Sequence, residues 1–291
     1  MDPLDPLETL ESLESASFDP TLPGTGGPPA PRWWGRPVAE TRWQAELARL
    51  LIDPVYRGEG IPRSDGAPVV CMPGFLAGDE SLRIMRGWLR RMGYDPRESG
   101  IQFNVDCSDR ALDRLEARVD RVYSQTGRRV ALVGHSRGGH FAKALAHRHP
   151  DRIACAVSLG AGLDRPFDIS VPTKAAVASF RTVYAATIDR VARNGCFTDT
   201  CRCRYAQDYS GTFPAEVPLT SIWSRGDGVV RWEACRVPYA ESVEVSGSHV
   251  GLAFNRKAYR ALGAALAASR PRARPASAPS AAHLPVAPAP G

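Results

Sequence analysis

A serine enclosed by glycines is the residue of this chain best suited to covalent chemistry. It lies in Gly134-His135-Ser136-Arg137-Gly138-Gly139, after an apolar run and before a helix-like segment. A G-x-S-x-G pattern between a strand and a helix predicts a sharp turn that lifts the serine hydroxyl above the edge of a sheet. The glycines remove the Cβ atoms that would collide in such a turn. Ser136 is therefore the candidate nucleophile.

A serine hydroxyl becomes a nucleophile when a base removes its proton and an acid holds that base in the right tautomer. Five of the six histidines are placed badly for this task, in the turn itself, along the helix after it, or in the tail: His135, His140, His147, His149 and His283. His249 remains, in a loop between the last predicted strand and the last predicted helix. Loops at the carboxyl edge of a parallel sheet commonly carry such groups. His249 is thus the candidate base by elimination.

The candidate acid is Asp227, in a glycine-flanked loop after the strand predicted at 219–223. The chain order Ser, Asp, His, with strands between them, is typical of enzymes whose nucleophile lies on such a turn. Asp164 and Asp168, which follow the preceding strand, are the alternatives. We expect Asp227 to orient His249.

A tetrahedral intermediate needs two backbone N–H donors for its oxyanion, each contributing roughly 3 kcal/mol. One is expected from Arg137, directly after the nucleophile. The other is expected from the turn Met72-Pro73-Gly74-Phe75-Leu76, which follows a predicted strand. Because proline has no N–H, we assign Phe75 rather than Pro73 as the second donor.

Strand-like and helix-like segments alternate along the middle of the chain. Short apolar runs predict strands at 67–72, 101–105, 129–133, 153–159, 219–223 and 242–245. Apolar residues at helical spacing predict helices between them, and Asn255 is the expected N-cap of the last helix. This alternation favours a parallel sheet covered by helices on both faces.

One segment, 163–218, is far longer than an ordinary connection. Its centre repeats apolar side chains at helical spacing: Val177, Phe180, Tyr184, Ile188 and Val191. We expect this segment to form a cap over the active site. The alternative is that the stripe simply packs on the sheet.

The two ends differ in composition from the expected folded domain at 33–269. Residues 1–32 predict a disordered acidic arm and a Pro/Gly linker, with a short docking helix as the alternative, and 270–291 predict a disordered Ala/Pro-rich tail. The arm lacks the basic start and apolar stretch of a secretory leader, so we expect a cytoplasmic location. No apolar run is long enough to predict a membrane span.

Charge and cysteine content suggest neither a nucleic-acid partner nor a metal. The net charge of +6 comes from scattered arginines without a nucleic-acid-binding motif. Cys71 and Cys155 lie in apolar runs and are expected in the core. The spacing of Cys196, Cys201 and Cys203 fits zinc poorly. We expect no metal and no cofactor.

The Ser136 turn, the Pro-Gly-Phe turn, the Asp227 loop and Ser248-His249 together resemble a bacterial α/β-hydrolase of the esterase/lipase type. The resemblance covers roughly 67–266 and implies an α/β fold with a mostly parallel sheet of about eight strands and a Ser-His-Asp triad. It further implies a small-molecule ester substrate cleaved through an acyl-serine, and the apolar stripe of the expected cap indicates a hydrophobic acyl or alcohol part. An acyltransferase or thioesterase with the same triad, and a non-catalytic binding protein of this fold, are the alternatives.

Overall fold

The computed structural model describes residues 40–187 and 203–269. Its described parts contain a six-stranded sheet in the order β2-β1-β3-β4-β5-β6, and every neighbouring pair runs parallel. The strands are β1 (Pro68–Met72), β2 (Asp95–Glu98), β3 (Val130–His135), β4 (Ile153–Leu159), β5 (Leu219–Ser224) and β6 (Glu241–Val245). Because all strands point the same way, the loops that follow them meet at one edge of the sheet.

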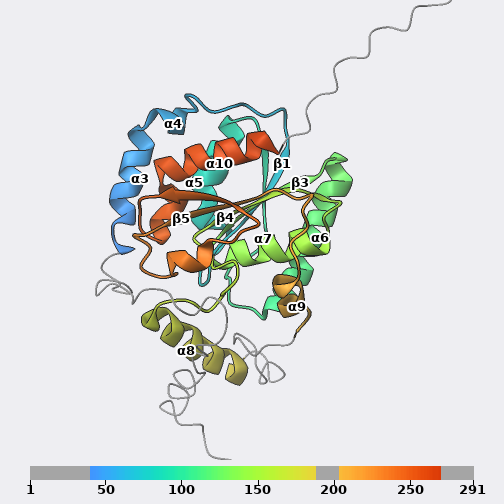
Figure 1. The fold of residues 1–291 in the computed structure, drawn as a ribbon, viewed down its shortest axis with the longest axis vertical. Coiled ribbons are helices and arrows are strands. Elements are labelled where there is room, and N and C mark those ends of the chain that lie inside the picture. The colour runs from blue at the N-terminus through green and yellow to red at the C-terminus, as the bar shows by residue number, and fades with distance from the viewer. Residues whose placement is uncertain (1–39, 188–202, 270–291) are drawn as a thin grey trace, which may run out of the picture.

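Helices cover both faces of this sheet, as Figure 1 shows. The α-helices are α3 (Trp43–Ile52), α4 (Pro54–Arg57), α5 (Arg83–Arg91), α6 (Ser108–Thr126), α7 (Arg137–Arg148), α8 (Val171–Thr187), α9 (Arg204–Ser210) and α10 (Arg256–Ala268). Short 3₁₀ turns are η1 (Asp79–Leu82), η2 (Trp232–Cys235) and η3 (Val250–Phe254). None of the helices in the described parts is long and apolar enough to cross a bilayer.

Two apolar cores lie on opposite faces of the sheet. Side chains from α3, α4, α5 and α10 form one core, in which the rings of Trp88 and Tyr259 pack at a tilt of 54° with their centroids 4.8 Å apart. The other core joins α6 and α7 to the sheet and includes the fully buried Phe141. The central strands β3 and β4 contribute side chains to both cores, which explains why they read as continuous apolar runs.

The strand predicted at 101–105 is wrong, because the strand of this region is β2 at Asp95–Glu98. β2 lies at the edge of the sheet, where polar residues and Pro96 are tolerated because one side of the backbone is unpaired. Residues 101–105 instead form an irregular loop in which Phe103 is exposed. Because strands were predicted from short apolar runs, an edge strand made of polar residues and a proline could not be found in this way.

Six strands occur in the described parts, against about eight expected. The described chain ahead of β1 is helical, in α3 and α4, and adds no strand to the sheet. The predicted arm at 1–32 and tail at 270–291 lie outside the described residues, as do Ile188 and Val191 of the predicted stripe. The stripe residue Phe180 lies on α8, at the lower end of the molecule in Figure 1.

Candidate active site

Ser136 occupies the turn between β3 and α7 in a backbone conformation that few non-glycine residues adopt. Its φ is 52° and its ψ is −123°. Such strain persists only where the surrounding structure over-determines it, and it concentrates at functional sites. Two backbone hydrogen bonds hold the turn, from Ser136 N–H to Leu159 O and from Gly139 N–H to Ser136 O, each 2.8 Å. The turn therefore presents the serine at the carboxyl edge of the sheet.

The three glycines around Ser136 are each required by a close approach of neighbouring atoms. A Cβ on Gly134 would lie 2.2 Å from the Gly138 backbone, and a Cβ on Gly138 would lie 2.1 Å from the Met72 carbonyl oxygen. A Cβ on Gly139 would lie 2.5 Å from Ser158 Oγ. The pattern that singled out this motif thus reflects the packing of α7 against β1, β3 and β4.

The structure brings Asp227 and His249 together at the same edge. Their side chains are buried, and His249 Nδ1 lies 2.7 Å from Asp227 Oδ2. The other carboxylate oxygen accepts the backbone N–H groups of Val229 and Val230, both at 2.8 Å. Asp227 is therefore held from one side by its own loop and presents one oxygen to the imidazole.

This arrangement sets the proton affinity of His249. Burial acts to lower its pKa, but the charge and hydrogen bond of Asp227, with a further contribution from Glu40, raise the pKa above the ordinary 6.5. The alternative acids are engaged elsewhere: Asp164 with Arg165, and Asp168 with both Arg165 and Arg231. Neither has a hydrogen bond to the imidazole among the contacts of the described residues.

Gly160, which directly follows β4, lies between the Ser136 turn and the Asp227–His249 pair. A Cβ there would be 3.1 Å from Asp227 Oδ2 and 3.2 Å from His249 Nδ1, and its φ is +61°. The preceding residue, Leu159, is the hydrogen-bond partner of Ser136 N–H. The Ser136 hydroxyl and the imidazole make no hydrogen bond among the described contacts, and such bonds commonly tighten only when substrate binds.

His135 lies in the Ser136 turn and was rejected as the candidate base. Its side chain instead forms a hydrogen bond to the backbone of His249. Burial lowers the pKa of His135 to about 4, so its ring is neutral at pH 7. Its Nε2 lies 2.9 Å from the His249 carbonyl oxygen, which can only accept, so Nε2–H is the donor. Sequence reasoning missed this contact because 114 residues separate the two histidines.

The second predicted oxyanion residue, Phe75, lies in the turn after β1. The next residue, Leu76, has a φ of 60°, and it and Ser136 are the two non-glycine residues with positive φ in the described chain. At Gly74 this turn comes close to Ser136, since a Cβ on Gly74 would lie 3.1 Å from Ser136 Cβ. Arg137 is the first residue of α7, where N–H groups point out of the helix end. The structure thus places the Phe75 turn beside Ser136.

A buried asparagine that the sequence did not reveal braces this turn. Asn104 Nδ2 donates to Pro73 O at 2.7 Å, and the Asn104 carbonyl accepts from Leu76 N–H at 3.3 Å. The Arg137 guanidinium in turn donates to both oxygens of Asn104 at 3.1 Å. The side chain of one predicted oxyanion residue therefore fixes the turn that carries the other.

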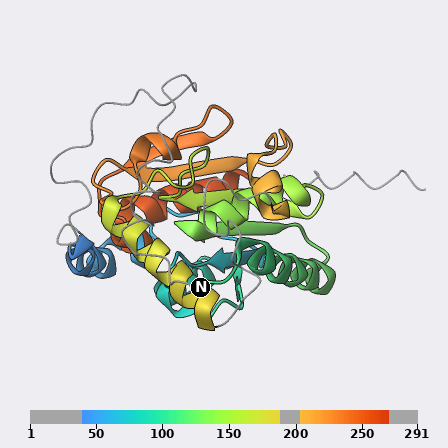
Figure 2. The same cartoon turned by 90° about the horizontal axis from the view of Figure 1, so that it is seen from below.

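Helix α8 runs between the Asp227 loop and the Phe75 turn. At its start, Ser170 N–H donates to Val229 O at 2.8 Å. Further along, the Phe180 ring lies 6.2 Å from that of Phe75 and 6.1 Å from that of Phe103. Because the two loops follow β5 and β1, α8 crosses the edge of the sheet between them, and Figure 2 shows it in the foreground.

Comparison with known proteins agrees with this architecture. A family model described as alpha/beta hydrolase fold matches residues 92–204. This is the α/β-hydrolase fold. No curated protein matches the chain.

Two solved structures illustrate the similarity. The mature lipase BlEst2 of Bacillus licheniformis is 15% identical, with 72% of this chain and 94% of that chain covered and a TM-score of 0.47. The Paleococcus ferrophilus monoacylglycerol lipase is 13% identical, with coverage of 70% and 97% and a TM-score of 0.49.

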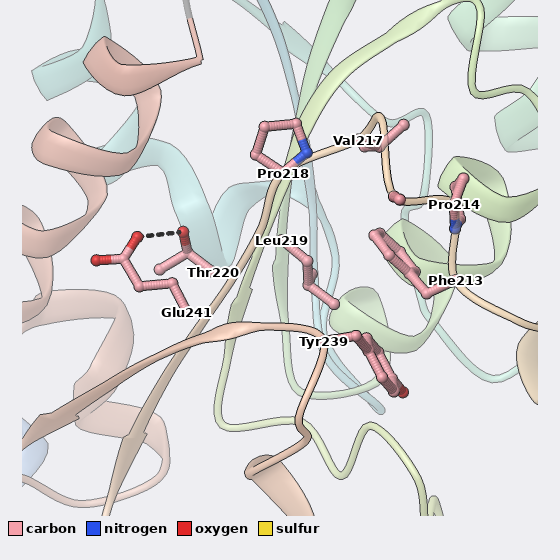
Figure 3. Close-up of a pocket in the computed structure, with 9 residues that line it drawn as sticks. Phe213, Pro214, Val217, Pro218, Leu219, Thr220, Tyr239 and Glu241 are labelled. Atoms are coloured by element: carbon pink, nitrogen blue, oxygen red, sulfur yellow. Dashed lines mark hydrogen bonds between the residues drawn. The ribbon is translucent and has the colours of Figure 1, made fainter.

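A pocket of about 460 Å³ lies elsewhere on this α/β-hydrolase fold. Figure 3 shows the residues that line it. Its wall includes the stacked rings of Phe213 and Tyr239, 5.6 Å apart, and the hydrogen-bonded pair Thr220 and Glu241. Thr220 and Glu241 lie at the amino ends of β5 and β6, whereas Asp227 follows the carboxyl end of β5. The pocket is therefore on the opposite edge of the sheet and is not part of the candidate active site.

Proposed function

We propose that this protein is a serine hydrolase that cleaves a carboxylic ester through an acyl-serine intermediate. The observation that carries the proposal is the buried Asp227–His249 pair, joined at 2.7 Å, at the sheet edge where strained Ser136 is presented. A carboxylate that fixes Nδ1–H leaves Nε2 as the basic nitrogen of the ring. That arrangement supplies a general base whose pKa the Asp227 carboxylate raises above the ordinary 6.5.

In the first half of the reaction, His249 Nε2 takes the proton of Ser136 Oγ as the oxygen attacks the ester carbonyl carbon. The N–H groups of Phe75 and Arg137 stabilise the oxyanion that forms. The intermediate collapses, the bond to the alkoxy oxygen breaks, and His249 gives its proton to the departing alcohol. Water then repeats these steps on the acyl-serine and returns the enzyme with release of the acid.

The aromatic side chains beside the oxyanion turn support an ester with an apolar part. Phe75, Phe103 and Phe180 lie together where the substrate's acyl or alcohol group would extend, and Leu76 is exposed next to them. In this proposal α8 acts as a cap over the site, because it joins the Asp227 loop to the Phe75 turn.

A fluorophosphonate probe and a series of nitrophenyl esters of increasing acyl length test this function. We expect the probe to label Ser136 and labelling and ester turnover to vanish in Ser136→Ala. The matched control is Ser124→Ala, an exposed serine on α6, which should retain both. Product analysis with added alcohol or thiol separates hydrolysis from acyl transfer. Undiminished labelling of Ser136→Ala would disprove the assignment.

A further inference from the structure

One carboxylate at the start of the described chain joins the two loops that carry the acid and the base. Glu40 Oε1 accepts the backbone N–H groups of Gly228 at 3.0 Å and His249 at 3.1 Å. Glu40 Oε2 accepts the N–H of Val250 at 2.9 Å. These contacts span 188 to 210 residues of sequence and involve the immediate neighbour of Asp227 and His249 itself.

Two more side chains of the same short segment contact these loops. On α3, Glu46 accepts from Ser248 N–H at 2.9 Å and from the Ser248 hydroxyl at 3.1 Å. Arg42 donates to the Gly226 carbonyl at 2.8 Å. Among the contacts of the described residues, Glu46 holds the His249 loop and Arg42 holds the Asp227 loop, whereas Glu40 contacts both.

The Glu40 contacts are strong by their chemistry. An ionised carboxylate that accepts backbone N–H groups forms bonds about twice as strong as neutral ones. The two loops are irregular, and their relative position sets the Asp227–His249 distance. Catalytic groups must be held to within about 0.5 Å of the productive geometry, and that precision needs supporting hydrogen bonds.

We propose that Glu40 is a positioning residue of the active site, which holds the acid loop and the base loop in register and adds negative charge beside the imidazole. The proposal rests on the proposed function, since it assigns Glu40 a role in the same reaction. It differs from a purely structural role because the charge of Glu40 acts on the proton affinity of His249.

The charged and titratable groups around His249 define what a pH profile would report. Asp227 and Glu40 both favour the protonated ring. His135 lies with its ring 5.0 Å away and has a pKa lowered to about 4, so it is neutral where His249 titrates. His140 has a pKa lowered to about 3 and is also neutral there. Loss of the Glu40 charge is therefore expected to move the titration of His249 to lower pH.

The test compares Glu40→Gln with Glu46→Gln and with Glu59→Gln, a charge-matched control at an exposed glutamate. We expect Glu40→Gln to lower kcat by about 10- to 100-fold, as loss of sub-ångström alignment does, with little change in KM. The acidic limb of kcat/KM should move to lower pH in Glu40→Gln. It should stay in place in Glu46→Gln and Glu59→Gln. Glu40→Asp, which keeps the charge but shortens the reach, should lower kcat with a smaller shift of the limb.

Two measurements keep this test separate from the proposed function. Amide hydrogen exchange at Gly228, His249 and Val250 should accelerate in Glu40→Gln, and the His249 imidazole resonances should titrate at lower pH. Both are read without turnover, so an inactive wild-type protein would refute the hydrolase assignment alone. Wild-type kcat and an unmoved acidic limb in Glu40→Gln would overturn the positioning role. So would a loss of kcat with unchanged exchange and titration.

Discussion

The substitution Gly138→Ala tests whether the close packing of α7 on β1 assembles the nucleophile and the oxyanion turn. The added Cβ would lie 2.1 Å from the Met72 carbonyl oxygen and 2.9 Å from that of Pro73. Ordinary contacts between heavy atoms lie near ~3.5 Å. The Met72 contact is with backbone at the carboxyl end of β1, which is paired with β3 on one side, so α7 and β1 must separate by roughly an ångström to admit the methyl group.

The effect on the free energy of unfolding is the cost of this separation minus the higher helix propensity of alanine over glycine. Overpacking of a rigid site costs typically ~1–3 kcal/mol, and contact with backbone atoms places Gly138→Ala at the upper end of that range. Alanine gains back about 1 kcal/mol over glycine in a helix. We therefore expect the free energy of unfolding to fall by about 2 kcal/mol. A displacement of this size should slow fluorophosphonate labelling of Ser136 on the order of 100-fold.

Urea denaturation followed by circular dichroism, together with the labelling rate, measures both quantities. The matched control is Gly87→Ala on α5, where the nearest atom to the new Cβ, Arg91 Nη1, is 3.9 Å away. That variant should keep its labelling rate and gain up to about 1 kcal/mol in the free energy of unfolding. If Gly138→Ala behaved like Gly87→Ala, the argument from close packing would be refuted.

Three further predictions follow from the contacts of the site. Asp227→Asn should lower kcat by about 10⁴-fold by fixing the wrong imidazole tautomer, whereas Asp164→Asn should stay near wild type; the reverse order would exclude Asp227 as the acid. The acidic limb of kcat/KM should have its midpoint above pH 6.5, because activity needs the neutral ring and the pKa of His249 is raised; a midpoint below 6.5 would contradict this. Burial lowers the pKa of Lys143 to about 8 from 10.5, so the unfolded chain binds more protons between these values. The free energy of unfolding should therefore rise between about pH 8 and 10.5 more steeply in the wild type than in Lys143→Met, and equal slopes would argue against the shift.

Local sequence signals predicted most of the helices and strands that carry the site. The apolar run at 153–159 became β4 with the same bounds, and Asn255 caps α10 by accepting from Lys257 and Ala258 N–H. The glycine pattern around Ser136 predicted the turn because each glycine answers a steric demand, from the Gly138 backbone at Gly134, from the Met72 backbone at Gly138 and from the Ser158 side chain at Gly139. The edge strand β2 escaped prediction because its polar residues and proline carry no apolar period.

The sequence by itself determined the chemistry available to this protein: a serine on a glycine-flanked turn, a loop histidine, an aspartate between them, and the parallel order of strands that carries each to one edge. These features can be read from the types and spacing of nearby residues, which set the local backbone conformation and the apolar period of each element. Only the tertiary structure decided which carboxylate side chains contact His249 and the loops around it. Asp227 rather than Asp164 contacts His249, and Glu40 reaches both loops across 188 or more residues. Such pairings depend on how whole elements pack in space, and no local pattern in the chain encodes them.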